Sequence, residues 1–78
     1  SESAFSRLFK KCTGRSVPQY LNELRIARAA RLLAETDHSV KQIAHQCGYP
    51  TAAYFHRQFQ RHQELPPLAY RDAIRRHA

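Results

Sequence analysis

A seven-residue pattern occurs twice in this 78-residue chain, with its two copies 50 positions apart. The segments 5–11 and 55–61 both read Phe-x-Arg-x-Phe-x-basic, and the same offset aligns Tyr20 with Tyr70. Self-similarity at a fixed offset is typical of one structural unit that is used more than once. We therefore expect two copies of the same helical unit, which restricts the possible folds more than any other feature of the sequence.

The segment before the second copy has no counterpart before the first. A helix-forming stretch over 39–47 precedes the second copy and is followed by Gly48 and Tyr49. By symmetry, the first copy should follow a similar helix, which would lie before Ser1. We expect the chain to be a fragment that begins inside a motif, so that its first unit is incomplete.

Hydrophobic periodicity and capping residues predict five helices and an all-α fold. In the first helix, apolar residues recur at i, i+3, i+4 and i+7, and Gly14 ends it. Ser-x-x-Gln capping boxes at 16–19 and 39–42 begin the second and third helices. Thr51 caps the fourth helix, and the proline pair 66–67 opens the fifth. No stretch alternates in the way that a half-buried strand does.

The second helix, from Ser16 to about Glu35, changes its apolar face near Arg25. One side carries Val17, Tyr20, Leu21 and Leu24, and the opposite side then carries Ile26, Ala29, Ala30 and Leu33. A helix of this kind suits a linker whose two halves pack on different subdomains. A central helix that is buried on all sides is the alternative.

The third and fourth helices have the proportions of a helix-turn-helix, whose second helix enters the major groove of DNA. Gly48 supplies the backbone freedom that the sharp turn needs. Phe55 and Phe59 mark the buried face of the fourth helix, and small and hydrogen-bonding residues occupy the opposite side. We predict that base edges are contacted by Ala52, Ala53, His56, Arg57 and Gln60. An ordinary solvated face is the alternative.

The first helix has a similar outward stripe, in which Ser3, Ser6 and Arg7 are the candidate base contacts. Polar and basic side chains near both stripes are candidate phosphate contacts, which hold a protein on DNA. They are Thr51, Lys41, Gln42, Lys10, Lys11, Arg15 and Arg61. A linker helix of about 18 residues is roughly 27 Å long, which suits two recognition helices in major-groove segments about 34 Å apart.

Composition favours a polyanionic partner. Thirteen Lys and Arg against six Asp and Glu give a net charge of +7, which attracts nucleic acid or an anionic membrane surface. There is no apolar run of transmembrane length and no signal peptide, so we expect no membrane association. Cys12 and Cys47 lie at apolar helical positions, so we expect both to be reduced core residues of a cytosolic protein.

Catalytic and metal-binding patterns are missing from the sequence. It has no Ser–His–acid arrangement and no Gly-rich phosphate loop, and its five histidines lack zinc-ligand spacing. We therefore expect no enzyme activity, no metal site and no cofactor. Two other binding functions stay open beside DNA recognition: a basic helical protein–protein interaction module and an RNA-binding domain.

Several spaced motifs together resemble the AraC/XylS family of bacterial transcription regulators. They are RIARAARLL at 25–33, VKQIA at 40–44, Gly48-Tyr49, YFHRQF at 54–59, Pro66-Pro67 with Tyr70-Arg71, FKKCTG at 9–14 and YLNELR at 20–25. The resemblance covers nearly the whole chain and implies two homeodomain-like helix-turn-helix units on double-stranded DNA. It implies base contacts at Ala52, Ala53, His56 and Arg57 in the second unit and at Ser3, Ser6 and Arg7 in the first.

The resemblance also implies a cytoplasmic, nucleoid-associated activator that acts through RNA polymerase. Residues 1–15 would hold the recognition helix of the incomplete first unit, 16–35 the linker helix and 39–78 the complete second unit. The chain departs from the family at Glu64, where Gly is usual, and at Pro66, where Ser or Thr is common. An incomplete first unit would leave Phe5, Leu8 and Phe9 without partners, so we expect self-association through this stripe.

Overall fold

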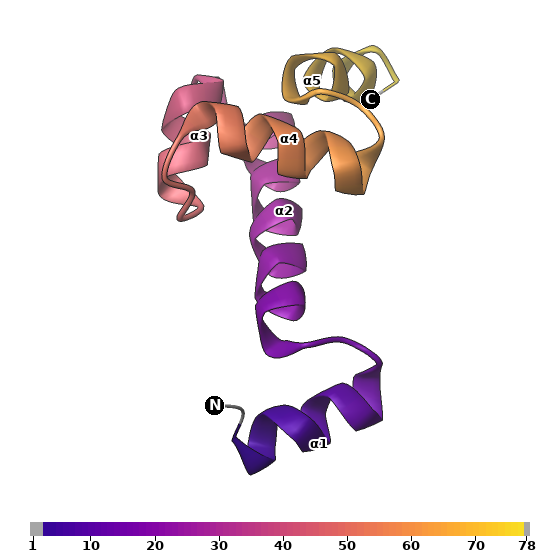
Figure 1. Ribbon diagram of the computed structural model, residues 1–78. Coiled ribbons are helices and arrows are strands. Elements are labelled where there is room, and N and C mark those ends of the chain that lie inside the picture. Colours follow the sequence, from indigo (N-terminus) through magenta and orange to yellow (C-terminus); the bar gives the residue numbers. More distant parts are fainter. Residues whose placement is uncertain (1–2, 78) are drawn as a thin grey trace.

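Five helices make up the part of the chain that the computed structural model describes, residues 3–77. They are α1 (Ala4–Thr13), α2 (Val17–Glu35), α3 (Val40–Gln46), α4 (Ala52–Gln63) and α5 (Pro67–Arg76) (Figure 1). No strand occurs within residues 3–77, and the predicted all-α fold is confirmed. The expected units 1–15 and 39–78 include Ser1, Glu2 and Ala78, which lie outside the described residues.

Local hydrogen bonds cap the first turns of α2 and α3, as the sequence predicts. Ser16 Oγ accepts from the Gln19 amide at 3.2 Å, and Gln19 Oε1 accepts from the Ser16 amide at 2.9 Å. Ser39 and Gln42 form the same pair of bonds at the start of α3, at 3.1 and 2.9 Å. Each box satisfies two amide groups that would otherwise lack a partner at the beginning of a helix.

The two copies of the sequence repeat make equivalent aromatic contacts in the structure. The rings of Phe9 and Tyr20 lie 5.2 Å apart between α1 and α2, and those of Phe59 and Tyr70 lie 5.3 Å apart between α4 and α5. Phe59 follows Phe9, and Tyr70 follows Tyr20, by the same offset of 50 residues. The unit that occurs twice is therefore a helix, a turn and the start of a second helix, held together by a Phe–Tyr contact.

The turns that end α1 and α4 also correspond. Gly14 and Glu64 both adopt the left-handed conformation, with φ of 76° and 65°, and their amides donate to Lys10 O and Gln60 O. Glu64 is the only non-glycine residue with positive φ among residues 3–77. A side chain in this conformation costs about 1–2 kcal/mol. The departure from Gly at position 64 therefore places a strained residue at the end of α4.

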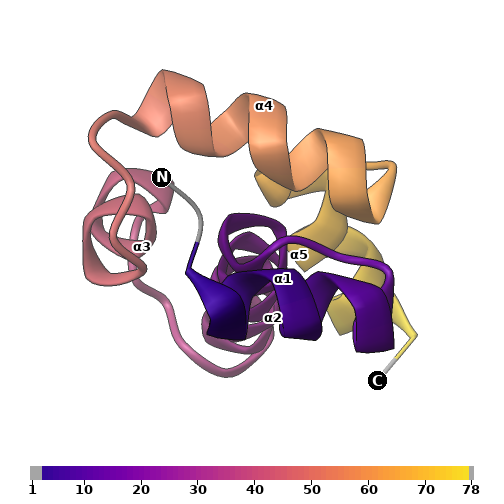
Figure 2. The same cartoon turned by 60° about the horizontal axis from the view of Figure 1, so that its bottom comes forward.

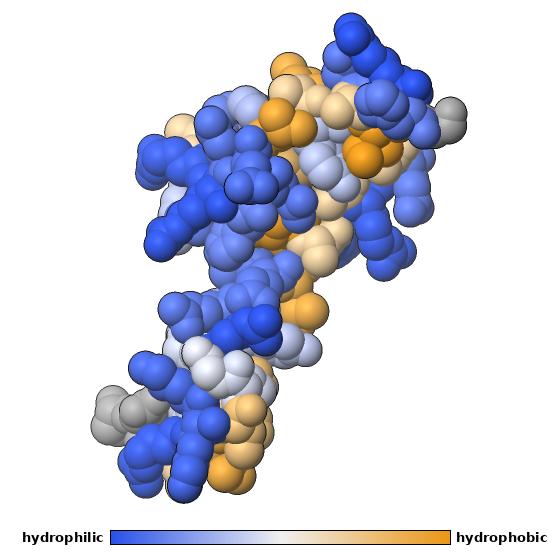
Figure 3. All heavy atoms as spheres, turned by 90° about the vertical axis from the view of Figure 1, so that its right-hand side faces the viewer, coloured by the Kyte–Doolittle hydropathy of each residue, from blue (hydrophilic) through white to orange (hydrophobic). Residues whose placement is uncertain are grey.

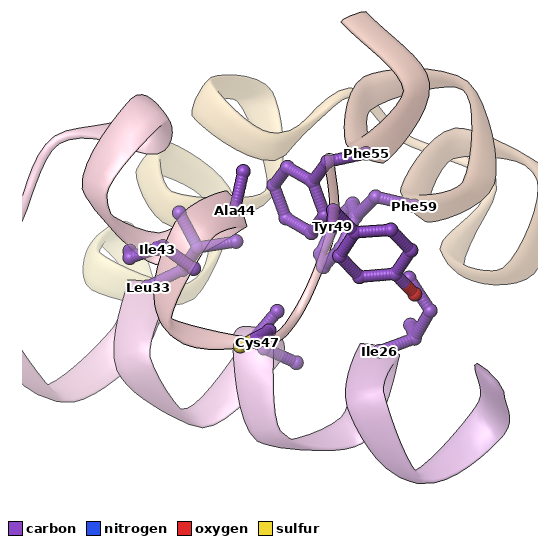
Figure 4. Packing of buried hydrophobic residues seen from close by; sticks show 10 residues of the cluster. Ile26, Leu33, Ile43, Ala44, Cys47, Tyr49, Phe55 and Phe59 are labelled. Atoms are coloured by element: carbon purple, nitrogen blue, oxygen red, sulfur yellow. The ribbon is translucent and has the colours of Figure 1, made fainter. Parts of the chain in front are cut away.

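The core lies between the second half of α2, α3, α4 and α5 (Figure 4). Its largest buried side chains are Phe55, Phe59, Ile26, Leu33 and Ile43. The first half of α2 contributes no buried residue, since Tyr20, Leu21 and Leu24 are 38%, 44% and 48% exposed. The predicted packing of the second half of α2 is confirmed, and the alternative of a helix buried on all sides is wrong. Packing of the first apolar face on another subdomain stays a prediction, since Tyr20 contacts Phe9 of α1 but Leu21 and Leu24 are exposed.

The molecule is elongated because α1 packs only at the far end of α2 (Figures 1 and 2). Its extents are 44 × 26 × 18 Å, and its radius of gyration of 14.3 Å exceeds the roughly 11.5 Å of a compact domain of this length. Phe9 is half-buried against Tyr20, but Phe5 and Leu8 are 66% and 58% exposed. Hydrophobic residues therefore form an exposed edge at the α1 end (Figure 3).

The two cysteines differ in their surroundings. Cys47 is buried in the core, as predicted, but Cys12 is exposed, and its assignment to the core is wrong. Cys12 lies near the end of α1. Within residues 3–77, α2 covers only part of the apolar face of α1, at Phe9, and leaves Cys12 exposed.

Candidate nucleic-acid interface

The turn between α3 and α4 sets the direction of α4. Gly48 has φ of 88°, and the Tyr49 amide donates to Ala44 O at 2.9 Å across the turn. Tyr49 is buried beside Phe55, with ring centroids 5.2 Å apart. Thr51 Oγ1 then accepts from the Tyr54 amide at 3.0 Å and caps α4. The predicted helix–turn–helix arrangement is thus built from a left-handed glycine, an aromatic anchor and a threonine cap.

The two sides of α4 differ in burial as the sequence predicts. Phe55 and Phe59 are fully buried, whereas the outer side is accessible. Of the five predicted base contacts on this helix, Ala53, His56, Arg57 and Gln60 are exposed and Ala52 is half-buried. The Arg57 guanidinium lies 5.8 Å from the centre of the Tyr54 ring, a cation–π contact that orients it. Base contact by these residues stays a prediction.

The start of α1 holds the other predicted base contacts. Ser3 caps the helix, because its Oγ accepts from the Ser6 amide at 3.1 Å and donates to Ser6 Oγ at 3.1 Å. Ser3 and Arg7 are exposed, and Ser6 is half-buried. Figures 1 and 2 both show α1 and α4 crossing α2 in a similar direction, with their amino-terminal ends on the same side of the molecule.

The predicted phosphate contacts fall into separate groups. Lys41 and Thr51 border a shallow cavity of about 350 Å³ between α3 and α4, together with Ala52. Lys10 and Lys11 are exposed in the last turn of α1. Gln42 Oε1 accepts from Ser39, so its amide NH₂ group is the part left to donate.

Two further phosphate candidates, Arg15 and Arg61, border one larger cleft of about 540 Å³. Arg15 comes from the loop after α1 and forms an ion pair with Glu23 at 3.0 Å. Arg61 comes from the last turn of α4 and is exposed. The structure therefore brings together side chains from both copies of the repeat.

Sequence reasoning missed a polar network that joins α2 to α4. Asn22 Oδ1 accepts from the Tyr49 hydroxyl at 2.5 Å, and Asn22 Nδ2 donates to Gln58 Oε1 at 3.2 Å. Asn22 Nδ2 also lies 3.1 Å from His62 Nε2. The available signal was helical spacing, since Asn22 precedes Ile26, Ala29 and Leu33 by 4, 7 and 11 residues and so shares their side of α2. This network fixes the angle between the linker helix and the fourth helix.

Sequence reasoning also missed a set of arginine hydrogen bonds that join α5 to the end of α2 and to the segment between α2 and α3. Arg71 Nε donates to Leu33 O at 2.9 Å, and its Nη2 donates to Thr36 O at 3.1 Å and His38 O at 2.7 Å. Arg75 Nη2 adds a bond to Thr36 O at 2.7 Å. The guanidinium groups satisfy carbonyls at the end of α2 and hold the chain that leads into α3.

Two buried groups in the turn have raised pKa values. Burial raises the pKa of the Tyr49 phenol to about 12, although the positive charge of Arg25 opposes the shift. Burial also raises the pKa of the Cys47 thiol, and Arg28 opposes that shift. Cys47 is therefore held as a neutral thiol and acts as an apolar core residue.

None of the helices within residues 3–77 combines the length and the apolar character that a bilayer crossing needs. Within the same residues, no three His, Cys, Asp or Glu side chains are grouped as metal ligands would be.

Comparison with known proteins shows what this arrangement belongs to. A family described as "Helix-turn-helix domain" matches residues 1–73. The HTH-type transcriptional activator RhaR of Mannheimia succiniciproducens is 42% identical over 88% of this chain, which spans 25% of that protein. The DNA-binding domain of AdpA, solved with a target DNA, superposes with a TM-score of 0.87 at 36% identity, over 94% of this chain and 66% of that one.

A second solved structure, a transcriptional regulator from Chromobacterium violaceum described as AraC-type, superposes with a TM-score of 0.85. It is 33% identical over 88% of this chain and 62% of that one. The chain therefore belongs to the AraC/XylS type of helix-turn-helix domain, found in bacterial transcription regulators.

Proposed function

We propose that this chain binds double-stranded DNA with sequence preference and serves bacterial transcription regulation. The observation that carries the proposal is the exposed side of α4, where Arg57, His56 and Gln60 face outward from a helix that Phe55 and Phe59 anchor. An arginine on a helix in the major groove can donate two hydrogen bonds to guanine. The 36% identity to a domain solved on its target DNA supports the same function.

Under this proposal, α1 is a second recognition helix, and α2 sets the distance between the two recognition helices. The 19 residues of α2 span roughly 28 Å, close to the 34 Å between successive major-groove segments. A single chain would then read a two-part, non-palindromic site. Residues 1–15 serve as part of the first unit, 16–35 as the linker helix and 39–78 as the second unit.

Membership of the family supports three further parts of this proposal. The domain acts by binding and not by catalysis, works on the bacterial nucleoid in the cytoplasm, and contacts RNA polymerase when bound to a promoter. The exposed side chains of Phe5 and Leu8, beside the half-buried Phe9, support self-association, in which the same edge of a second copy would shield them from water.

Selection of bound duplexes from a random pool tests the proposal, followed by Arg57→Ala on the selected sequence. We expect this change to weaken binding by about 1–3 kcal/mol and to relax preference at one base pair. Arg31→Ala is the matched control, because Arg31 is also an exposed arginine but lies on α2, outside the recognition face. A pool without enriched sequences, or a stronger preference for single-stranded RNA or an acidic protein, would contradict the proposal.

A further inference from the structure

The cleft between α4 and the beginning of α2 is lined by both copies of the repeat. It has a volume of about 540 Å³, within the range of ligand-binding clefts. The loop after α1 contributes Arg15, the middle of α2 contributes Arg25, and α4 contributes Tyr54 and Arg61. Arg25 was not among the residues that the sequence singled out for DNA contact, because it lies where the apolar face of α2 changes side.

The charge of this cleft is positive. Its only carboxylate is Glu23, and that group is paired with Arg15 at 3.0 Å. Neither Arg25 nor Arg61 forms a hydrogen bond or an ion pair within residues 3–77. The cleft therefore presents two uncompensated guanidinium groups, which can bind phosphate through two donors each.

The walls of the cleft are held in place. Asn22 on its floor bonds to Tyr49 and Gln58, which fixes α2 against α4. Gly48 brings the turn close to Arg25, since a Cβ atom at this glycine would lie 3.4 Å from Arg25 Nε. A site that is already ordered loses less entropy when it binds an anion.

The cleft adjoins the proposed DNA-binding side of α4. Tyr54, in its wall, contacts the Arg57 guanidinium, and Arg61 lies one helical turn beyond Arg57. Figure 1 shows α1 at one end of α2 and α4 across its other half. The cleft is lined by the loop after α1, by α2 and by α4, so it lies between the two proposed recognition helices. When two helices occupy successive major-groove segments on one face of the duplex, the minor groove and the two sugar–phosphate strands that border it lie between them.

We propose that Arg25, projecting from the linker helix, binds the phosphodiester backbone between the two base-contact sites, with Arg15 and Arg61 on either side. This inference rests on the proposed DNA-binding function and adds a central contact to it. Such a contact depends on charge and not on base sequence. It would make the affinity sensitive to the distance between the two half-sites, since only a correct distance brings a backbone phosphate into the cleft.

The test combines protein variants with a duplex from the pool selection. We expect Arg25→Ala to weaken binding and to lower the slope of log affinity against log salt by about one unit, without changing base preference. Arg25→Lys should restore most of the slope because it keeps the charge. Arg31→Ala is the control, since it removes an exposed charge of α2 that does not line the cleft.

Replacement of one DNA phosphate at a time by an uncharged methylphosphonate, with measurement of affinity, locates the contact. On the unsubstituted protein, a loss of affinity at phosphates between the half-sites supports the inference, and a loss confined to the flanking phosphates overturns it. With Arg25→Ala, the same central substitution should cause less loss than it does with Arg25 in place. This scan also gives an answer if Arg25→Ala fails to fold.

Two failures are distinguishable. If Arg25→Ala keeps the affinity and the salt slope of the original chain while Arg57→Ala weakens binding, the central contact is wrong and DNA recognition by α4 stands. If the original chain enriches no duplex sequence, the proposed function fails, and the inference fails with it.

Discussion

Replacement of Arg71 by Ala tests whether the arginine from α5 holds the second helix-turn-helix unit together. Its guanidinium donates to three carbonyl groups, those of Leu33, Thr36 and His38, which lie 33 to 38 residues away in the chain. It also places a positive charge near the carboxyl-terminal end of α2, where the helix dipole favours a cation. No other group of α5 makes as many contacts of this kind within residues 3–77.

The expected loss follows from these bonds. A hydrogen bond with a charged donor contributes about 1.5–3 kcal/mol when it is buried. Arg71 is only half-buried, and two of its bonds share Nη2. Water can therefore bond to the freed carbonyl groups in the variant, which reduces the loss of stability. We therefore expect Arg71→Ala to lower the free energy of unfolding by about 2–3 kcal/mol. Arg71→Lys should lose about 1–2 kcal/mol, because an ammonium group cannot match the planar fork.

Thermal unfolding followed by circular dichroism measures this effect. In a domain of this size, 1 kcal/mol corresponds to roughly 4–8 °C, so the midpoint should fall by roughly 8–24 °C. Arg76→Ala is the control on the same helix, since its pair with Asp72 is exposed and contributes about 0.3–0.5 kcal/mol. Equal midpoints for Arg71→Ala and Arg76→Ala would refute the structural role assigned to Arg71.

Two further predictions concern the strained cap and the buried phenol. Glu64→Gly should raise the melting midpoint, because relief of strain of about 1–2 kcal/mol at φ of 65° exceeds the entropic cost of glycine, about 0.4–1 kcal/mol; a lower midpoint would contradict this. Folding raises the pKa of Tyr49 from 10.0 to about 12, so stability that is fully present below pH 10 should decline as the pH rises toward 12. Tyr49→Phe should lack this component of the decline in urea unfolding, and identical pH profiles would exclude it.

The sequence alone determined those features that depend on residues within four positions of one another. Ser16 and Gln19 begin α2, and Gly14 ends α1, through bonds that the local chain makes by itself. The repeat also predicted two copies of one helical unit, and the structure then shows a matching Phe–Tyr contact in each copy. For the same reason, the outer side of α4 could be assigned from periodicity before its burial was known.

Only the tertiary structure decided which faces are covered and which distant groups meet. Cys12 shares a face with buried-type residues, but periodicity cannot tell whether another layer of protein lies over that face. The convergence of Arg25 and Arg61 on one cleft, and of Arg71 on the carbonyls after α2, joins positions more than 30 residues apart. Such contacts depend on the angles at which whole helices pack, and these angles follow from the summed shape of the core and not from any local pattern.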